Sequence, residues 1–585
     1  MGTSTSPETQ RGSSSPDAED NTGIILGTGY FQRTTLLFAS VVALVLGLND
    51  FLPLLAVPEV DYWCASSHQV NVSEGKNMSI PVQENNSQCY MSEGSLEANQ
   101  SVIPCTAWHY DHTLHYLTAV EEWNLVCNDS WLAPTSTAVY MLGSAVGTAA
   151  MGFLSDSIGR KPVSCIGSVA TLLLCVAAIN TKTIQAFILI RFLSGAAISG
   201  TGITIYVLIL EVIPTSRRAL YAFVMWSGYS CGMTTIRTAE GFHVAWRSVQ
   251  FGMIIPTALL LFVFAVLEES PRWLISQWDL ANAERTILII AKKNKRKRSD
   301  ALDTWNKNKV GLELAEENYS STLKVNLTRV LLTRQLRCSN IILCLSCFAI
   351  SFTFFSMTFN TEDTLQIVVM GGIVAGIPPD IAAYIGMEHL GRKPTLVIAL
   401  LLTALSCVAE LILRDIQKTL WNMVTLGLGL FFSAVAMRVV SLYVIEVNPT
   451  SVRTIAVCCL GVCGRTGCIL AAYSHELSRA TPRAMPFVLY AMGCSLGGVF
   501  ATLLPETRSV RLPEAVRKED VYVIAPLQVH RRRKGRKSPE RRGGSPPSLS
   551  SEYQRSSPLV IHSVDEDVDF RDIVCRSTES TGMAL

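Results

Sequence analysis

The feature that most constrains this chain is a succession of long apolar runs separated by polar stretches. A membrane-spanning helix needs roughly 20 mostly apolar residues, and about twelve runs approach that length. Only 16% of the residues are charged, against about 25% in soluble domains. The sequence therefore predicts an all-helical membrane protein with spans near 34–55, 134–154, 163–180, 184–210, 219–239, 248–267, 340–358, 366–387, 395–413, 420–444, 454–473 and 486–504.

Two polar segments of opposite character set the expected orientation. Residues 56–133 contain ten acidic residues and one lysine, whereas residues 268–339 are rich in Lys and Arg and include KKNKRKR. Because an excess of Lys and Arg marks the cytoplasmic side, we expect the second segment and both termini in the cytoplasm. The expected organisation is a cytoplasmic segment at 1–33, a six-helix bundle at 34–267 with an extracellular loop at 56–133, a cytoplasmic loop at 268–339, a second six-helix bundle at 340–504 and a disordered cytoplasmic tail at 505–585.

The first loop has the composition of a glycosylated segment on a lumenal or extracellular face, and the expected location of the protein is the plasma membrane. Its N-glycosylation sequons are at Asn71, Asn77, Asn85, Asn99 and Asn128. Four cysteines in such a loop are expected to form two disulfides, with three connectivities possible, and unpaired thiols are the alternative. These cysteines are Cys64, Cys89, Cys105 and Cys127.

The chain lacks sequence patterns for several other functions. There is no zinc-type cysteine or histidine spacing, no catalytic triad and no phosphate-binding glycine loop. We therefore expect neither an enzyme nor a cofactor or metal site. The basic residues cluster locally at a net charge of +2, so nucleic acid is not an expected partner. For the basic tail, a solvated linker is favoured over a patch that binds lipid or protein.

A polar motif occurs twice, as GFLSDSIGRKP at 152–162 and GMEHLGRKP at 386–394. A carboxylate near a helix end can accept hydrogen bonds from free backbone N–H groups or pair with an arginine. We interpret each copy as a latch that forms in one conformation only, with ordinary anchoring by Arg-Lys as the alternative. The matching residues are Asp156, Gly159, Arg160 and Lys161 in the first copy, and Glu388, Gly391, Arg392 and Lys393 in the second.

Further charged residues lie at the C-terminal ends of the fourth and tenth predicted helices. Glu211 and Arg218, with Arg217, occupy this position in the first half, and Glu446 and Arg453 occupy it in the second. We interpret them as a second gate network between the halves.

The first copy of the motif, within GSAVGTAAMGFLSDSIGRKP, resembles the signature loop of the major facilitator superfamily. Other segments are similar to the organic cation, organic anion and carnitine transporters of solute carrier family 22. These are EEWNLVCNDSW at 121–131, RFLSGA at 191–196, LEVIPTSRRA at 210–219, AWRSVQ at 245–250, ESPRWLIS at 269–276, YVIEVNPTSVRT at 443–454 and LLPETR at 503–508. The resemblance runs from about residue 30 to 510 and is specific to that family.

The resemblance implies two pseudo-symmetric six-helix bundles that rock around a site near the bilayer midplane. The expected substrate is a small organic ion, moved with a coupling ion such as Na⁺ or H⁺ or against a counter-substrate. Membrane lipid is the other expected partner.

Three of the arginines within predicted spans are singled out as candidates. Cation carriers of the family have an aspartate at the position of Arg465, whereas anion and carnitine carriers have an arginine, so the resemblance implies that Arg465 binds a carboxylate or sulfate. A packing arginine bonded to backbone carbonyls is the alternative. Arg438 replaces a small residue, and either attracts anions or fills space and pairs with Glu446. Arg191 is expected to be structural, near the cytoplasmic end of its helix.

Aromatic side chains are expected to complete the site. Phe348, Phe352, Phe355 and Phe359 share one helical face, which lines either an amphiphile pocket or the packed interior. Tyr206 matches a tyrosine that lines the family's cavity. Trp226 and Tyr229 are weaker candidates.

Two departures from the family pattern bear on function. Gly376 stands where the family's eighth helix has a glutamate, and Glu388 replaces the aspartate of the second motif. The leading hypothesis is a carrier of organic anions or carnitine-like zwitterions. A cation carrier would need an acid in the cavity, and Asp50 and Asp380 are discounted because they lie near helix ends. A transporter-like receptor that no longer transports is the remaining alternative.

Overall fold

The computed structural model describes residues 29–508 except for 59, 66–88, 94–100, 111–116, 215–216, 278, 304, 307–333, 360–373, 414–418, 449 and 483. The chain divides into two compact units, Met1–Ile524 and Ala525–Leu585, and every described residue belongs to the first. The predicted tail therefore lies outside the described residues, except for its first few positions.

The first half of the chain forms a bundle of long helices, which we call the first bundle. Its elements are α2 (Tyr30–Phe51), α3 (Pro53–Ala56), α6 (Leu132–Ile158), α7 (Arg160–Ile179), α8 (Ile184–Glu211), α9 (Arg218–Gly241), α10 (Trp246–Gly252), α11 (Ile254–Ala258), η3 (Leu259–Phe262) and α12 (Val263–Val266). The last four segments together make one apolar span, which contains Pro256; a proline removes a backbone donor and interrupts regular helix. The short α13 (Pro271–Ser276) and amphipathic α14 (Leu280–Lys293) follow.

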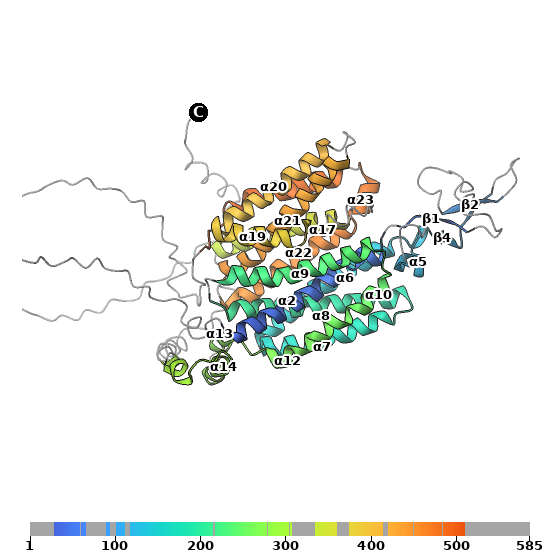
Figure 1. Cartoon of the computed structure of the whole chain (residues 1–585). Helices are drawn as coiled ribbons and strands as arrows, with labels where there is room; N and C mark the ends of the chain where they lie inside the picture. The colour runs from blue at the N-terminus through green and yellow to red at the C-terminus, as the bar shows by residue number, and fades with distance from the viewer. Residues whose placement is uncertain are drawn as a thin grey trace, which may run out of the picture. The chain divides into compact units, whose positions relative to one another are not determined.

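The second half repeats this pattern as the second bundle. Its helices are α17 (Arg334–Phe359), α19 (Ile377–His389), α20 (Arg392–Leu413), α21 (Thr419–Val447), α22 (Thr450–Ala472), α23 (Ser474–Ala480) and α24 (Met485–Ala501). Figure 1 shows these yellow-to-orange helices gathered beside the blue-to-green helices of the first bundle.

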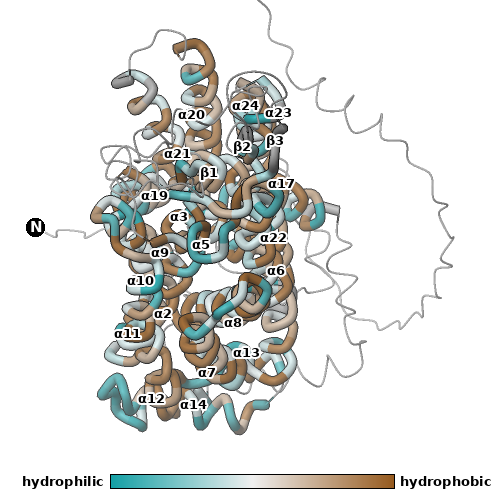
Figure 2. The backbone as a smooth tube through the Cα atoms, turned by 90° about the vertical axis from the view of Figure 1, so that its right-hand side faces the viewer, coloured by the Kyte–Doolittle hydropathy of each residue, from teal (hydrophilic) through white to brown (hydrophobic). Residues whose placement is uncertain are grey.

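The all-helical membrane fold predicted from the sequence is confirmed. Within the described residues, nine helices or helical stretches are long and apolar enough to cross a membrane, and α9, α19 and α24 occupy the other three predicted positions. Figure 2 shows hydrophobic stretches along most of these helices, for example along α8, α20 and α22. Residues 366–373, the beginning of the predicted eighth span, lie outside the described residues.

Within the first bundle, α6 and α8 approach closely because glycines leave room for the opposing backbone. A Cβ atom at Gly143 would collide with the carbonyl oxygen of Phe192, and one at Gly147 would collide with that of Ala196. Small residues at helix interfaces allow such backbone contact within membranes. This packing fixes α6, the helix that carries the first polar motif.

The two bundles touch at both ends. At the end that carries the polar motifs, here called the motif end, Arg160 donates to the Thr454 hydroxyl at 3.4 Å, and the Cys458 thiol donates to the Thr148 carbonyl at 3.3 Å. At the opposite end, the loop end, the Thr135 and Tyr473 hydroxyls are 3.1 Å apart. The bundles are therefore in contact at both ends of the helices.

The cysteine-bearing loop contains two short antiparallel ribbons. Strand β1 (Tyr62–Cys64) pairs with β4 (Trp108–Tyr110), and β2 (Tyr90–Glu93) pairs with β3 (Ser101–Pro104). The structure joins Cys64 to Cys105 and Cys89 to Cys127, one of the three connectivities that the sequence allows. Helix α5 (Ala119–Glu122) and the 3-10 turn η1 (Cys127–Asp129) lead into α6. Asn128 lies in η1, whereas the other four predicted glycosylation sites, at positions 71, 77, 85 and 99, lie outside the described residues.

Replacing Gly147 with Ala should destabilise the protein, because the added methyl group has no space against α8. Overpacking of this kind costs about 1–3 kcal/mol. Thermal unfolding of the detergent-solubilised protein should therefore occur at a lower temperature. Gly252→Ala is the matched control, since no heavy atom lies within 4 Å of a Cβ there. Equal unfolding temperatures for the two variants would contradict the close α6–α8 contact.

Candidate functional site

The two bundles are joined by an ion pair between Asp50 on α2 and Arg465 on α22. The Arg465 Nη1 lies 2.8 Å from the Asp50 Oδ2. The Asp50 side chain is fully buried and also accepts hydrogen bonds from the hydroxyls of Tyr140, at 2.6 Å, and Tyr229, at 3.0 Å. In this conformation the Arg465 charge is therefore neutralised by a carboxylate of the opposite bundle.

This arrangement corrects the sequence argument that set Asp50 aside. Asp50 is indeed in the last turn of α2, but a helix end need not lie at the membrane surface. After Leu52 the chain continues into α3 (Pro53–Ala56), whose four residues are all buried. The carboxylate is thus enclosed by protein, where it requires a cationic partner.

Arg191 on α8 lies beside this ion pair. Its Nη2 donates to the backbone carbonyl of Asn49 at 2.9 Å, and its guanidinium is 3.9 Å from the centre of the Tyr140 ring. The expectation that Arg191 lies near the motif end of its helix is wrong. Helix α7 begins at the motif end, so α8 begins at the loop end, and Arg191 is in its second or third turn.

A second buried ion pair joins Arg438 on α21 to Asp380 on α19. The Arg438 Nε is 2.7 Å from the Asp380 Oδ1. Ser230 of α9 donates to the Asp380 Oδ2 at 2.6 Å and accepts from the Arg438 Nη2 at 3.1 Å, so a hydroxyl of the first bundle completes the cluster. The proposed pairing of Arg438 with Glu446 is wrong, because Glu446 pairs with Arg392.

Asp380 was set aside for the same reason as Asp50. It lies in the first turn of α19, yet only 1% of its surface is exposed, since α9 and α21 pack against it. A small cavity adjoins the cluster and is lined by Ala222, Phe223, Trp226, Asp380, Ala383, Met387 and Arg438.

The predicted aromatic residues divide into two groups. Phe355 stacks on Phe51 of α2 with ring centres 5.6 Å apart, and Phe359 lies 5.7 Å from Phe355. Phe352 instead contacts Tyr490 of α24 at 5.3 Å and stacks with Phe348 at 6.4 Å, within the second bundle. Only the first group reaches the interface between the bundles.

The aromatic residues of the first bundle lie near Arg438. Its guanidinium is 4.9 Å from the ring centre of Trp226 and 5.5 Å from that of Tyr229. Tyr206 is buried and makes an edge contact with Trp226, with ring centres 6.2 Å apart. Tyr229 therefore connects the two ion pairs, since its hydroxyl binds Asp50 and its ring faces Arg438.

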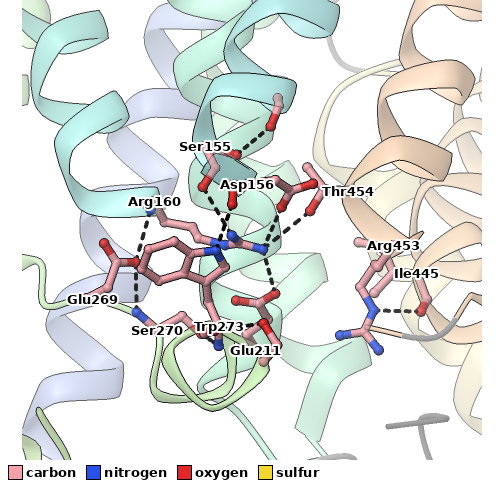
Figure 3. Close-up of polar contacts among 12 residues, drawn as sticks. Ser155, Asp156, Arg160, Glu211, Glu269, Ser270, Trp273, Ile445, Arg453 and Thr454 are labelled. Atoms are coloured by element: carbon pink, nitrogen blue, oxygen red, sulfur yellow. Dashed lines mark hydrogen bonds and ion pairs between the residues drawn. The ribbon is translucent and has the colours of Figure 1, made fainter. Parts of the chain in front are cut away.

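At the motif end, Arg160 is the centre of a buried network (Figure 3). It pairs with Asp156 at 2.9 Å and with Glu211 at 3.3 Å, and it reaches Thr454 of the second bundle. Trp273 of α13 donates its indole N–H to the Asp156 carbonyl at 3.1 Å. The structure therefore brings together three of the predicted gate residues of the first bundle, Asp156, Arg160 and Glu211.

Glu269, which the sequence analysis did not single out, caps the N-terminus of α7. The Glu269 carboxylate accepts from the backbone N–H groups of Arg160, at 3.0 Å, and Lys161, at 3.1 Å. It thus satisfies free donors at the helix N-terminus, where negative charge is favoured. Gly159 has φ +106°, a backbone conformation that L side chains rarely adopt, and a Cβ there would press against Glu269.

The second motif repeats this arrangement with other partners. Arg392 pairs with Glu446 at 3.0 Å, and the Glu506 carboxylate accepts from the backbone N–H groups of Arg392, at 2.9 Å, and Lys393, at 3.1 Å. Gly391 also has φ +106°. Glu388, in the place of Asp156, forms no ion pair with any residue that the structure describes.

Arg453 and Arg218, the remaining predicted gate residues, lie near the motif end. Arg453 donates to the carbonyls of Ile445, at 3.3 Å, and Asn448, at 3.4 Å, and Arg218 is fully buried nearby. Glu268 holds α14 to this end, since it pairs with Lys161 at 3.3 Å and Lys293 at 2.7 Å. Partial burial raises the pKa of Glu268, but these two ammonium groups outweigh it and lower the pKa below its usual range.

With this geometry described, the chain can be compared with known proteins. A family model described as "Sugar (and other) transporter" matches residues 76–518. The chain belongs to this family. It shares the major facilitator fold with the proton:xylose symporter XylE bound to 6-bromo-6-deoxy-D-glucose, with a TM-score of 0.57, 16% identity, and coverage of 82% of this chain and 98% of that structure.

Curated relatives confirm the resemblance to solute carrier family 22. Solute carrier family 22 member 12 of Homo sapiens is 29% identical over 422 residues, which cover 71% of this chain and 75% of the relative. Member 7 of Homo sapiens is 27% identical, covering 73% and 78%. The "Beta-alanine transporter" of Drosophila melanogaster is 25% identical, covering 72% and 70%. The chain is thus a membrane transporter of the major facilitator type.

Replacing Glu269 with Ala should destabilise the motif end, because two backbone N–H groups at the start of α7 lose their acceptor. Loss of a helix cap costs about 0.5–2 kcal/mol. Thermal unfolding of the solubilised protein measures the effect, and Glu506→Ala should behave alike. Glu388→Ala is the matched control, since this carboxylate has no ion-pair partner among the described residues. A larger effect at Glu388 than at Glu269 would contradict the capping role.

Proposed function

We propose that the chain moves carnitine-like zwitterions or organic anions across the membrane by alternating access, and that Arg465 binds the substrate carboxylate. The observation that carries this proposal is the ion pair between Arg465 and Asp50. It joins the two bundles, and both side chains are shielded from solvent.

The ion pair provides a physical link between substrate and conformation. Rocking of the bundles to open the loop end would draw α2 away from α22 and separate Asp50 from Arg465. Removing one partner of a buried ion pair costs about 3–5 kcal/mol, because a charge is left uncompensated. A substrate that supplies a carboxylate to Arg465 offsets this cost.

The same pair favours zwitterions over simple anions. An anion at Arg465 would leave Asp50 without its cation, whereas a zwitterion supplies a carboxylate to Arg465 and a cationic group to Asp50. The local charge then stays balanced in every state. One curated relative is named a β-alanine transporter, and β-alanine is a molecule of this type.

Organic cation transport is the second candidate function. A cation carrier needs acidic side chains inside the protein, and Asp50 and Asp380 are buried there. Both carboxylates already have arginine partners, which is why this candidate ranks lower.

We also propose a plasma-membrane location with the motif end and both termini in the cytoplasm. Coupling to Na⁺ or H⁺, or exchange against a second solute, remains part of the same proposal.

Arg465→Gln should reduce uptake of a transported zwitterion by about 100-fold, equivalent to about 2.7 kcal/mol. The measurement is radiolabelled uptake into cells with β-alanine, carnitine, an aryl carboxylate and tetraethylammonium, corrected for surface expression. Arg479→Gln is the matched control, because Arg479 is exposed at the loop end.

Three results would contradict the proposal. Unchanged zwitterion uptake by Arg465→Gln would remove Arg465 from the site. Uptake of tetraethylammonium alone would favour the cation carrier. The absence of uptake for the whole panel by well-expressed protein would favour a receptor without transport activity.

A further inference from the structure

Arg438 lies in surroundings that are typical of a binding site for organic cations. Its guanidinium packs over the rings of Trp226 and Tyr229, at 4.9 and 5.5 Å, and contacts the buried carboxylate of Asp380 at 2.7 Å. Aromatic faces beside a carboxylate are what proteins use to hold quaternary ammonium and guanidinium groups. Here the cation is supplied by the chain itself.

Gly376 and Arg438, two positions of the second bundle that differ from the family pattern, bear on this cluster. Gly376 stands where the family pattern has a glutamate, and Asp380 follows it by four residues, about one helical turn later. Arg438 stands where the pattern has a small residue. In this chain the Arg438 guanidinium neutralises the Asp380 carboxylate.

We propose that Arg438 is a tethered cation that fills a latent organic-cation site and so excludes cationic substrates from the centre of the protein. The site is formed by Asp380 and the rings of Trp226 and Tyr229. Arg438 also lines a small cavity, together with Phe223 and Met387. Shortening the Arg438 side chain would join its volume to that cavity.

The proposal differs from a purely structural role for Arg438. Asp380 and Arg438 belong to the same bundle, and α9 of the other bundle contacts them through the Ser230 hydroxyl and the rings of Trp226 and Tyr229. A structural brace would lose stability on truncation, and no dissolved ion would restore it. A tethered cation can be replaced by a free one of matching chemistry.

The test is chemical rescue of Arg438→Ala in the purified full-length protein. Thermal unfolding is followed with added ethylguanidinium chloride, tetramethylammonium chloride or sodium chloride at equal ionic strength. The variant should unfold at a lower temperature than wild type. Either organic cation should raise that temperature in a saturable manner, since a ligand that binds only the folded state stabilises it. Sodium chloride should not.

Three controls isolate the site. Wild type and Arg438→Lys should show no cation-dependent shift, because the site is already filled. The double variant Arg438→Ala with Asp380→Asn should lose the rescue, with at least about tenfold weaker binding of the cation. Arg438→Ser offers a hydroxyl to Asp380 and serves as a second variant if Arg438→Ala yields little folded protein.

Three outcomes would overturn the proposal. The first is a folded Arg438→Ala that no organic cation stabilises. The second is rescue that persists without the Asp380 charge. The third is loss of folded protein in both the Ala and Ser variants that organic cations in the solubilisation buffer do not reverse. Because the readout is binding, these outcomes are independent of whether zwitterions are transported.

Discussion

An ionised side chain buried between the two bundles is costly unless a partner compensates it, because the surrounding membrane and protein solvate charge poorly. Asp50 pairs with Arg465 and Asp380 with Arg438, and Arg160 pairs with Glu211 at the motif end. Two of these three clusters also contact the opposite bundle through hydroxyl groups. The contacts that compensate the charges therefore also determine how the bundles fit together.

The fold could be predicted from local sequence patterns, because the length of an apolar run and the residues of a turn are each contained in a single stretch of chain. The repeated glycine at positions 159 and 391 was found in this way, and its φ of +106° in both copies explains why the residue recurs. The partners of the buried arginines were harder to infer, since they come from distant segments. Asp50, 415 residues before Arg465, shows this most clearly.

Some of the missed residues did leave a signal in the sequence. Glu269 and Glu506 stand at equivalent places after the last span of each half, in ESPR and PETR, and each caps the helix that follows its own motif. A search for matching acids as well as matching motifs would have found them. By contrast, nothing local distinguishes the aromatic group that reaches Phe51 from the group that packs on Tyr490, because both share one stripe along α17.

The connection between α6 and α7 has a mechanical consequence. Helix α6 ends at Ile158 and α7 begins at Arg160, so one glycine separates a helix that contacts the opposite bundle from one with a largely exposed apolar surface. Because a single residue connects the two helices, tilting one of them must displace the adjoining end of the other. The apolar outer surface of α7 is therefore mechanically coupled to the helix that contacts the opposite bundle.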